Sequence, residues 1–169
     1  MMQNPDYILA QVQSLAIEAG RRVMAERERF DLCRVEKKGA HDFVSYVDRE
    51  SEAFITKHLQ QIIPEAGFIV EEGSRTYTGE PFCWVVDPLD GTTNFIHNQW
   101  PYCVSIALRD KANILLGVVY DPIRDECFYS TAHGGASYVG STPIHVSAVS
   151  QLKDACIALG LPYDTVKYP

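Results

Sequence analysis

The hydrophobic period of the chain changes once, at Pro64, and this change most strongly limits the folds open to it. Before Pro64, apolar residues recur at three- and four-residue steps, which is the period of a helix with one buried face. The first such segment predicts a helix that has Asn4 as its N-cap and Pro5 in its first turn, and that ends near Phe30. Its apolar stripe comprises Ile8, Leu9, Val12, Leu15, Ala16, Ala19 and Val23.

The second periodic segment predicts a helix over residues 48–63, because a proline disfavours helical backbone in the residue before it. We expect this helix to bury four apolar side chains, those of Phe54, Ile55, Leu59 and Ile62. Between the two helices we expect a polar loop over residues 37–42 and then a short strand over residues 43–46.

After Pro64 the apolar runs are short and are separated by turn residues such as Asp, Asn and Pro. We expect strands over residues 67–70, 83–86, 104–109, 114–120, 127–130 and 137–139, and a further buried strand over residues 155–161. Two helices followed by strands joined by tight turns predict an α+β fold, with the helices packed on a mainly antiparallel sheet. We place one α+β unit at residues 1–154 and the start of a second portion at residues 155–169.

Composition limits the classes of partner that we expect and indicates the cellular compartment. The 169 residues suit about one domain, and 22 acidic against 15 basic residues give a net charge of −7, which disfavours nucleic acid and anionic membranes as partners. No apolar run approaches the ~18–20 residues of a membrane span, and we expect no secretory signal. The 5 cysteines are odd in number and form no CxxC pair, so we expect reduced thiols in a cytoplasmic protein.

The most informative segment covers residues 84–95, where an apolar strand ends in Asp87-Pro88-Leu89-Asp90-Gly91. The turn forced by Pro88 and Gly91 returns Asp90 to the side of Asp87. Two carboxylates held closely repel each other unless a cation lies between them, and oxygen ligands favour Mg²⁺, Mn²⁺ or Ca²⁺ over zinc. The alternative to a cation site is a loop that only turns the chain, because Asp-Pro and Asp-Gly are common in turns.

The residues that follow, Thr92-Thr93-Asn94, can open a short helix whose free N–H groups face a bound phosphate. A second acidic element, Glu71-Glu72, follows the strand at 67–70. Adjacent residues of an extended chain point to opposite sides, so one of the two reaches the site, or both are simply solvated.

Two further positions have competing explanations. Asp48 stands where a helix N-cap belongs, so capping alone can account for it. Lys37 is most simply a solvated charge, and the 5 histidines show no spacing typical of metal ligands.

Taken together, these segments resemble the inositol monophosphatase family, part of the lithium-sensitive, Mg²⁺-dependent sugar phosphatase superfamily. Asp87-Pro88-Leu89-Asp90-Gly91-Thr92-Thr93-Asn94-Phe95 is similar to the family's first signature, with Glu71-Glu72 upstream and residues 37–48 matching in order and spacing. The resemblance implies the front part of the layered α/β sugar-phosphatase fold.

The resemblance also implies a role for each matching residue. The catalytic residues would be Asp48, Thr92 and Glu71, with the Thr92 hydroxyl bonded to Asp48 and acting on the attacking water. Backbone N–H groups of Gly91 and Thr92 would hold the substrate phosphate. Lys37 and Glu72 remain further candidates, and Glu72 is the alternative to Glu71 as metal ligand. The metal ligands would be Glu71, Asp87, the backbone carbonyl of Leu89, and Asp90.

The activity implied by the resemblance is hydrolysis of a phosphate monoester, foremost myo-inositol monophosphate, in a homodimer that needs Mg²⁺. Mn²⁺ would substitute for Mg²⁺, and Li⁺ and Ca²⁺ would inhibit. Alternatives are a 3′,5′-bisphosphate nucleotidase, a histidinol phosphatase, a fructose-1,6-bisphosphatase, or a catalytically dead protein-binding module of the same fold.

The chain also departs from the family pattern. The family's later Trp-Asp segment, which supplies another metal-binding Asp, has no counterpart here, because Trp84 and Trp100 stand in other contexts. We therefore expect the isolated 169-residue chain to be nearly inactive.

Overall fold

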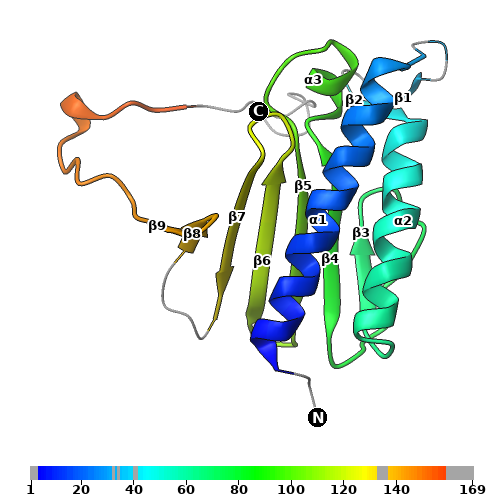
Figure 1. The fold of residues 1–169 in the computed structure, drawn as a ribbon, viewed down its shortest axis with the longest axis horizontal. Helices are drawn as coiled ribbons and strands as arrows, with labels where there is room; N and C mark the ends of the chain where they lie inside the picture. Colours follow the sequence, from blue (N-terminus) through cyan, green and yellow to red (C-terminus); the bar gives the residue numbers. More distant parts are fainter. Residues whose placement is uncertain (1–3, 32, 34, 40–41, 133–136, 159–169) are drawn as a thin grey trace.

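The protein is described by a computed structural model that covers residues 4–31, 33, 35–39, 42–132 and 137–158. Helices α1 (Pro5–Glu28) and α2 (Tyr46–Ile62) lie side by side across one face of a sheet (Figure 1). The described part of this sheet contains, in spatial order, β3 (Gly67–Val70), β4 (Cys83–Asp90), β5 (Cys103–Arg109), β6 (Ile114–Asp121), β7 (Glu126–Thr131), β8 (Ser137–Val139) and β9 (Thr142–Ile144).

Neighbouring strands of this sheet are also consecutive in the sequence. β3 and β4 run parallel, and each later pair is antiparallel. The predicted α+β fold, with two helices on a mainly antiparallel sheet, is confirmed. Short elements complete the described structure: the two-stranded ribbon of β1 (Val35–Gly39) and β2 (Asp42–Ser45), helix α3 (Thr92–Ile96), and the 3₁₀ turn η2 (Leu152–Asp154).

Helix α1 begins as its sequence predicts. The Asn4 side chain accepts a hydrogen bond from the backbone N–H of Asp6 at 3.0 Å, and Pro5 occupies the first helical position, where a missing N–H costs nothing. The predicted apolar stripe is buried and packs on β5, β6 and β7. The helix ends at Glu28, slightly before the expected end near Phe30.

Helix α2 begins earlier than expected, at Tyr46, because Ser45 and not Asp48 is its N-cap. Asp48 is the third helical residue and completes a capping box: its side chain accepts from the Ser45 backbone N–H at 2.8 Å and from the Ser45 hydroxyl at 2.6 Å. The prediction of Asp48 as N-cap was therefore wrong by one turn. Of the four apolar side chains expected to be buried, Ile55 and Leu59 are, whereas Phe54 and Ile62 are only partly covered.

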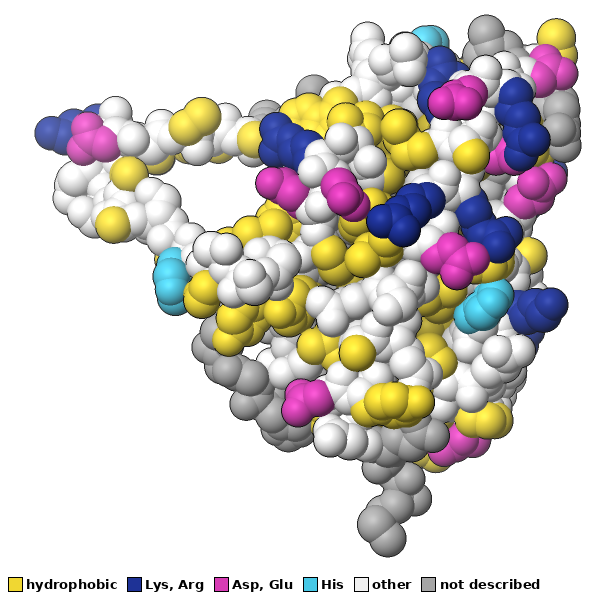
Figure 2. All heavy atoms as spheres, viewed as in Figure 1, with side chains coloured by type: hydrophobic (Ala, Val, Ile, Leu, Met, Phe, Trp, Pro, Cys, Tyr) yellow, Lys and Arg dark blue, Asp and Glu magenta, His cyan; other side chains and the backbone are white. Residues whose placement is uncertain are grey.

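The core lies between the two helices and the sheet. Alternate residues of β5, namely Val104, Ile106 and Leu108, are buried, and the residues between them are half-exposed on the opposite face. Over the outer surfaces of α1 and α2, basic and acidic side chains are interspersed (Figure 2). Among the described helices, none combines the length and apolar character needed to cross a membrane.

Three local expectations were wrong. The loop expected over residues 37–42 is partly strand, because residues 37–39 belong to β1 and Asp42 belongs to β2, which pairs with β1. The strand expected over residues 43–46 therefore runs from Asp42 to Ser45, and Tyr46 is already helical. Strand β9 was not expected. Residues 155–158 are exposed and form no strand, and the rest of the strand expected over residues 155–161 lies outside the described residues.

Candidate functional site

Strand β4 brings Asp87 and Asp90 to the same side of the sheet, although residues three apart in a regular strand face opposite sides. Asp87 pairs with Ser105 of β5 and Asp90 pairs with Cys103, so β4 holds one extra residue between the two pairs. This bulge reverses the alternation, and it places both carboxylates on the face opposite to the helices. The backbone N–H of Leu89 donates to Asp87 Oδ1 at 3.2 Å within the bulge.

The parallel pairing of β3 with β4 brings Glu71 to Asp87. Val70 at the end of β3 lies opposite Val86, and an acid follows each of them: Glu71 just beyond β3, and Asp87 within β4. The Glu71 and Asp87 side chains share a hydrogen bond. Burial, this hydrogen bond and the negative charges of Glu71 and Asp90 raise the pKa of Asp87 to about 8.

Glu72 has a different electrostatic environment. Its charge acts on the Arg49 guanidinium of α2, whereas the charge of Glu71 acts on Asp87. The structure thus brings Glu71, Asp87 and Asp90 together, and Glu72 lies near enough to Arg49 to raise the pKa of that guanidinium. Lys37 lies in β1, and its side chain falls outside the described residues.

Thr92 links the end of β4 to the start of α2. Its hydroxyl lies 2.7 Å from Asp48 Oδ1 and 3.0 Å from the backbone oxygen of Leu89, and the Asp48 side chain is 1% exposed. The hydroxyl has one proton, so it donates to one of these two acceptors at a time. Asp48 thereby accepts the cap bonds from Ser45 through Oδ2 and the bond from Thr92 through Oδ1.

Gly91 is the N-cap of α3 and has a φ of +95°, a left-handed conformation that side chains disfavour. A Cβ at Gly91 would lie 2.8 Å from the backbone oxygen of Pro101, so the close approach of the segment that leads into β5 also requires glycine here. The N–H groups of Gly91 and Thr92 fall at the helix start, where backbone donors lack partners within the helix.

Two further residues at this site were missed from the sequence. Glu52 of α2 is fully buried, and its carboxylate accepts from the backbone N–H groups of Glu72 at 2.7 Å and Ser74 at 3.0 Å. The Cys103 thiol lies 3.8 Å from Asp90 Oδ2, and burial together with the charges of Asp90 and Asp87 raises its pKa to about 12. The thiol of Cys103 is therefore protonated at neutral pH and is a poor nucleophile.

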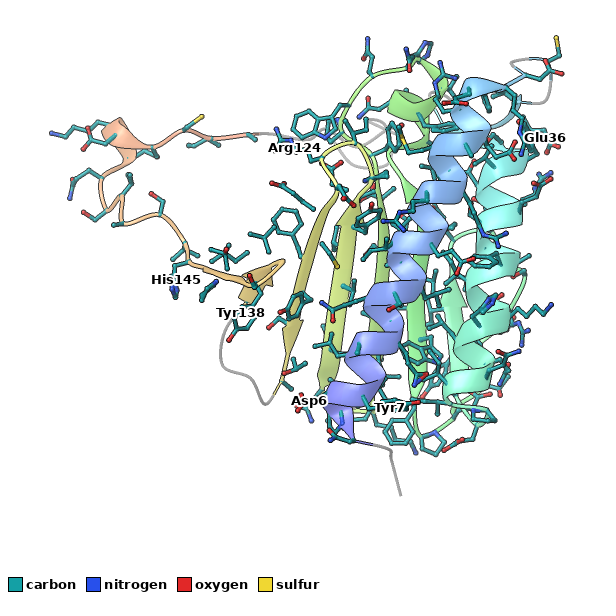
Figure 3. All side chains as sticks on the ribbon, viewed as in Figure 1. Asp6, Tyr7, Glu36, Arg124, Tyr138 and His145 are labelled. Carbon is teal, nitrogen blue, oxygen red and sulfur yellow. The ribbon has the colours of Figure 1, made fainter. Side chains whose placement is uncertain are left out.

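These residues gather at one end of the molecule, where α3 lies. Glu36 of β1 and Arg124 of the β6–β7 turn lie at this end, opposite to Asp6 and Tyr7 at the start of α1 (Figure 3). Within the described ranges, no three side chains of His, Cys, Asp or Glu are arranged tightly enough to hold a metal ion by themselves.

The fold and the site define a class: an α+β protein whose adjacent strand ends bring acidic side chains beside a threonine and a helix start. The chain belongs to the inositol monophosphatase family, whose sequence pattern matches residues 4–169. It is 37% identical over 149 residues to an inositol-1-monophosphatase of Mesorhizobium japonicum, covering 88% of this chain and 56% of that protein. It is also 37% identical over 154 residues to the Nus factor SuhB of Escherichia coli, covering 90% of this chain and 57% of that protein.

Solved structures agree with this assignment. The extragenic suppressor protein SuhB of Bartonella henselae superposes with a TM-score of 0.79 at 34% identity, covering 85% of this chain and 55% of that one. An IMPase of Thermotoga maritima superposes with a TM-score of 0.76 at 31% identity, covering 83% of this chain and 54% of that one. The chain thus spans little more than half the length of the relatives it matches.

Proposed function

We propose that the chain forms the front portion of a Mg²⁺-dependent phosphomonoesterase that acts on a small phosphorylated polyol, foremost myo-inositol monophosphate. The observation that carries the proposal is the contact between Glu71 and Asp87, with Asp90 on the same face of the sheet. Carboxylates in contact repel each other when they are ionised, and a divalent cation removes this cost. The relative named inositol-1-monophosphatase supports the choice of substrate.

The donor atoms at this site suit Mg²⁺. The carboxylates of Glu71, Asp87 and Asp90 and the backbone oxygen of Leu89 would hold the cation, and all are the hard oxygen ligands that Mg²⁺ and Mn²⁺ prefer. The raised pKa of Asp87 fits the same interpretation, because burial, the hydrogen bond with Glu71 and the charges of Glu71 and Asp90 all disfavour its ionised form when no cation is bound. When bound, Mg²⁺ lowers the pKa of coordinated water from ~15.7 towards neutrality and offsets negative charge on the phosphate.

The chain's own groups would position the other reactants. The N–H groups of Gly91 and Thr92 would donate to phosphate oxygens, in keeping with their place at the start of α3. The Thr92 hydroxyl, while donating to Asp48, has lone pairs free to accept a hydrogen bond from the attacking water. Asp48 would thereby fix the direction of the Thr92 proton and, through it, of the water. Phosphoryl transfer depends mainly on such positioning.

Mn²⁺ binding tests the metal site without requiring turnover. We expect electron paramagnetic resonance titration of the 169-residue chain to detect a Mn²⁺ site that Asp87→Asn removes. The matched control is Asp154→Asn, an equal charge change at an exposed residue of η2. Absence of Mn²⁺ binding by the unaltered chain, or equal binding by the Asp87→Asn variant, would contradict the proposal.

Phosphate release tests the substrate. Inositol 1-phosphate, adenosine 3′,5′-bisphosphate and histidinol phosphate are compared in Mg²⁺, and Li⁺ and Ca²⁺ are expected to slow the reaction. A preference for the nucleotide would move the assignment to a bisphosphate nucleotidase. An intact mass well above 19.0 kDa for the protein from its source would show that a longer chain should be assayed.

A protein-binding module is the second candidate, favoured by relatives named Nus factor SuhB that match at the same identity as the phosphatase. The net charge of −7 favours a protein partner over RNA. Asp87→Asn separates the two functions, because it should abolish hydrolysis and leave binding to a protein intact.

We also propose a cytoplasmic location and a homodimeric state for the protein. The cysteines Cys33, Cys83, Cys103, Cys127 and Cys156 are all free thiols, which supports a cytoplasmic location. The family resemblance supports a homodimer, and sedimentation velocity measures it: a species at the monomer mass alone would contradict the dimer.

A further inference from the structure

Glu52 is a buried acid whose two side-chain oxygens accept hydrogen bonds from outside its own helix, in the loop that follows Glu71. The side chain is 0% exposed, and its two oxygens accept separately from the N–H groups of Glu72 and Ser74. A carboxylate without such partners is costly to bury, because it loses its hydration. The chain therefore pairs this acid with a single short segment that follows β3.

The bond to Glu72 acts directly on Glu71. The N–H of Glu72 belongs to the planar peptide unit that also contains the Cα and carbonyl group of Glu71. Fixing this N–H at 2.7 Å from Glu52 Oε2 fixes the plane on one side of the Glu71 Cα. The bond to Ser74 holds the loop on the other side of Gly73, which has a φ of +73°. Glu71 therefore leaves β3 in a defined direction, towards Asp87.

Asp48 and Glu52 are four residues apart and so project from the same face of α2. Asp48 bonds Thr92 beyond β4, and Glu52 bonds the loop beyond β3. We infer that Glu52 is a positioning residue that holds Glu71 against Asp87, so that one turn of α2 aligns both strand ends of the site. The inference rests on the proposed function.

The test compares Glu52→Gln with the unaltered chain. Glutamine has nearly the same shape but only one acceptor oxygen, so one of the two N–H bonds is lost. We expect the Mn²⁺ dissociation constant to rise ~10–100-fold, the usual effect of losing a group that orients a ligand. Hydrogen exchange at residues 71–74 should also accelerate by about tenfold or more, while α1 and β6 stay protected.

The control is Leu59→Ala, a change at a fully buried core residue two turns further along α2. It should lower thermal stability at least as much as Glu52→Gln and leave the Mn²⁺ dissociation constant unchanged. If Glu52→Gln does not fold, Glu52→Asp replaces it: this variant keeps both acceptors but is one methylene shorter, and it should also weaken Mn²⁺ binding.

The outcomes separate this inference from the proposed function. If the unaltered chain binds Mn²⁺ and the Glu52 variant that folds binds it equally well, the inference alone fails. If Leu59→Ala weakens binding as much as Glu52→Gln, the effect is general destabilisation and the inference fails. If the unaltered chain binds no Mn²⁺, the proposed function fails and the positioning role falls with it, even when exchange shows that Glu52 holds the loop.

Discussion

The hydrogen bond between Thr92 and Asp48 should couple the stability of the β4–α3 turn to that of the α2 start. A double-mutant cycle with Thr92→Val and Asp48→Ala isolates this bond. Asp48→Ala also removes the two cap bonds to Ser45, but those losses are the same with or without the Thr92 hydroxyl and cancel in the cycle.

The expected coupling follows from the contacts. A hydrogen bond to a charged group contributes ~1.5–3 kcal/mol, and the Asp48 side chain is buried, so screening by water is small. When Asp48 is removed, the Thr92 proton turns to the Leu89 oxygen, which is already at 3.0 Å, and recovers ~0.5–1.5 kcal/mol. The net coupling should therefore be ~1–2 kcal/mol. A chain of this size loses ~2–4 °C in Tm for each kcal/mol.

Urea unfolding of the four proteins measures the coupling, with midpoints compared at equal slopes. The control cycle pairs Thr92→Val with Thr56→Val, because Thr56 is a buried α2 threonine that bonds within its own helix. That pair should be additive within ~0.5 kcal/mol. A coupling below ~0.3 kcal/mol for the Thr92–Asp48 pair, or one equal to that of the control, would refute the reasoning.

Other predictions concern backbone, pH and thiols. Gly73→Ala should cost ~1–2 kcal/mol for its left-handed backbone, whereas Gly91→Ala should cost ~1–3 kcal/mol more, because its Cβ would meet the Pro101 oxygen; equal urea midpoints would contradict this. Because the folded-state pKa of Asp87 is about 8, the folded chain keeps a proton that the unfolded chain releases near pH 4, and stability without divalent cations should fall from pH 4 to 8. Thermal melts of Asp87→Asn should lack that part of the decline. A thiol reagent at neutral pH should label two cysteines rapidly and three more only after unfolding; the fast pair should be the exposed Cys33 and Cys156.

Elements with a strong hydrophobic period were predictable from the sequence, since each is decided by its own residues. The stripe of α1 and the buried alternation of β5 are examples. β1 was not predictable, because Val-Glu-Lys-Lys-Gly carries no apolar alternation and becomes a strand only by pairing with β2. The start of α2 had a local signal, Ser45 three residues before Asp48, but a capping box more often ends in Glu or Gln.

The residues of the candidate site were predictable where they lie close together in one segment of the sequence. Asp87, Asp90, Gly91 and Thr92 stand within six residues, and their spacing alone indicated a turn with two carboxylates. Glu52 was not predictable, because in the sequence it is an ordinary helical glutamate. Its burial is decided by a loop 20 residues later, and such long-range contacts leave no periodic pattern.

The sequential order of the sheet has a consequence for synthesis on the ribosome. Each strand from β4 onward pairs with the strand made just before it, so the sheet can grow as the chain emerges. Helix α1 differs, because its apolar stripe packs on β5, β6 and β7, and β6 is complete only roughly 90 residues after α1 ends. At ~5–20 residues per second this delay is on the order of ten seconds. During that interval the part of the stripe that packs on β6 and β7 stays uncovered, although α2 is already available to lie beside α1, and such apolar surface is of the kind that chaperones bind.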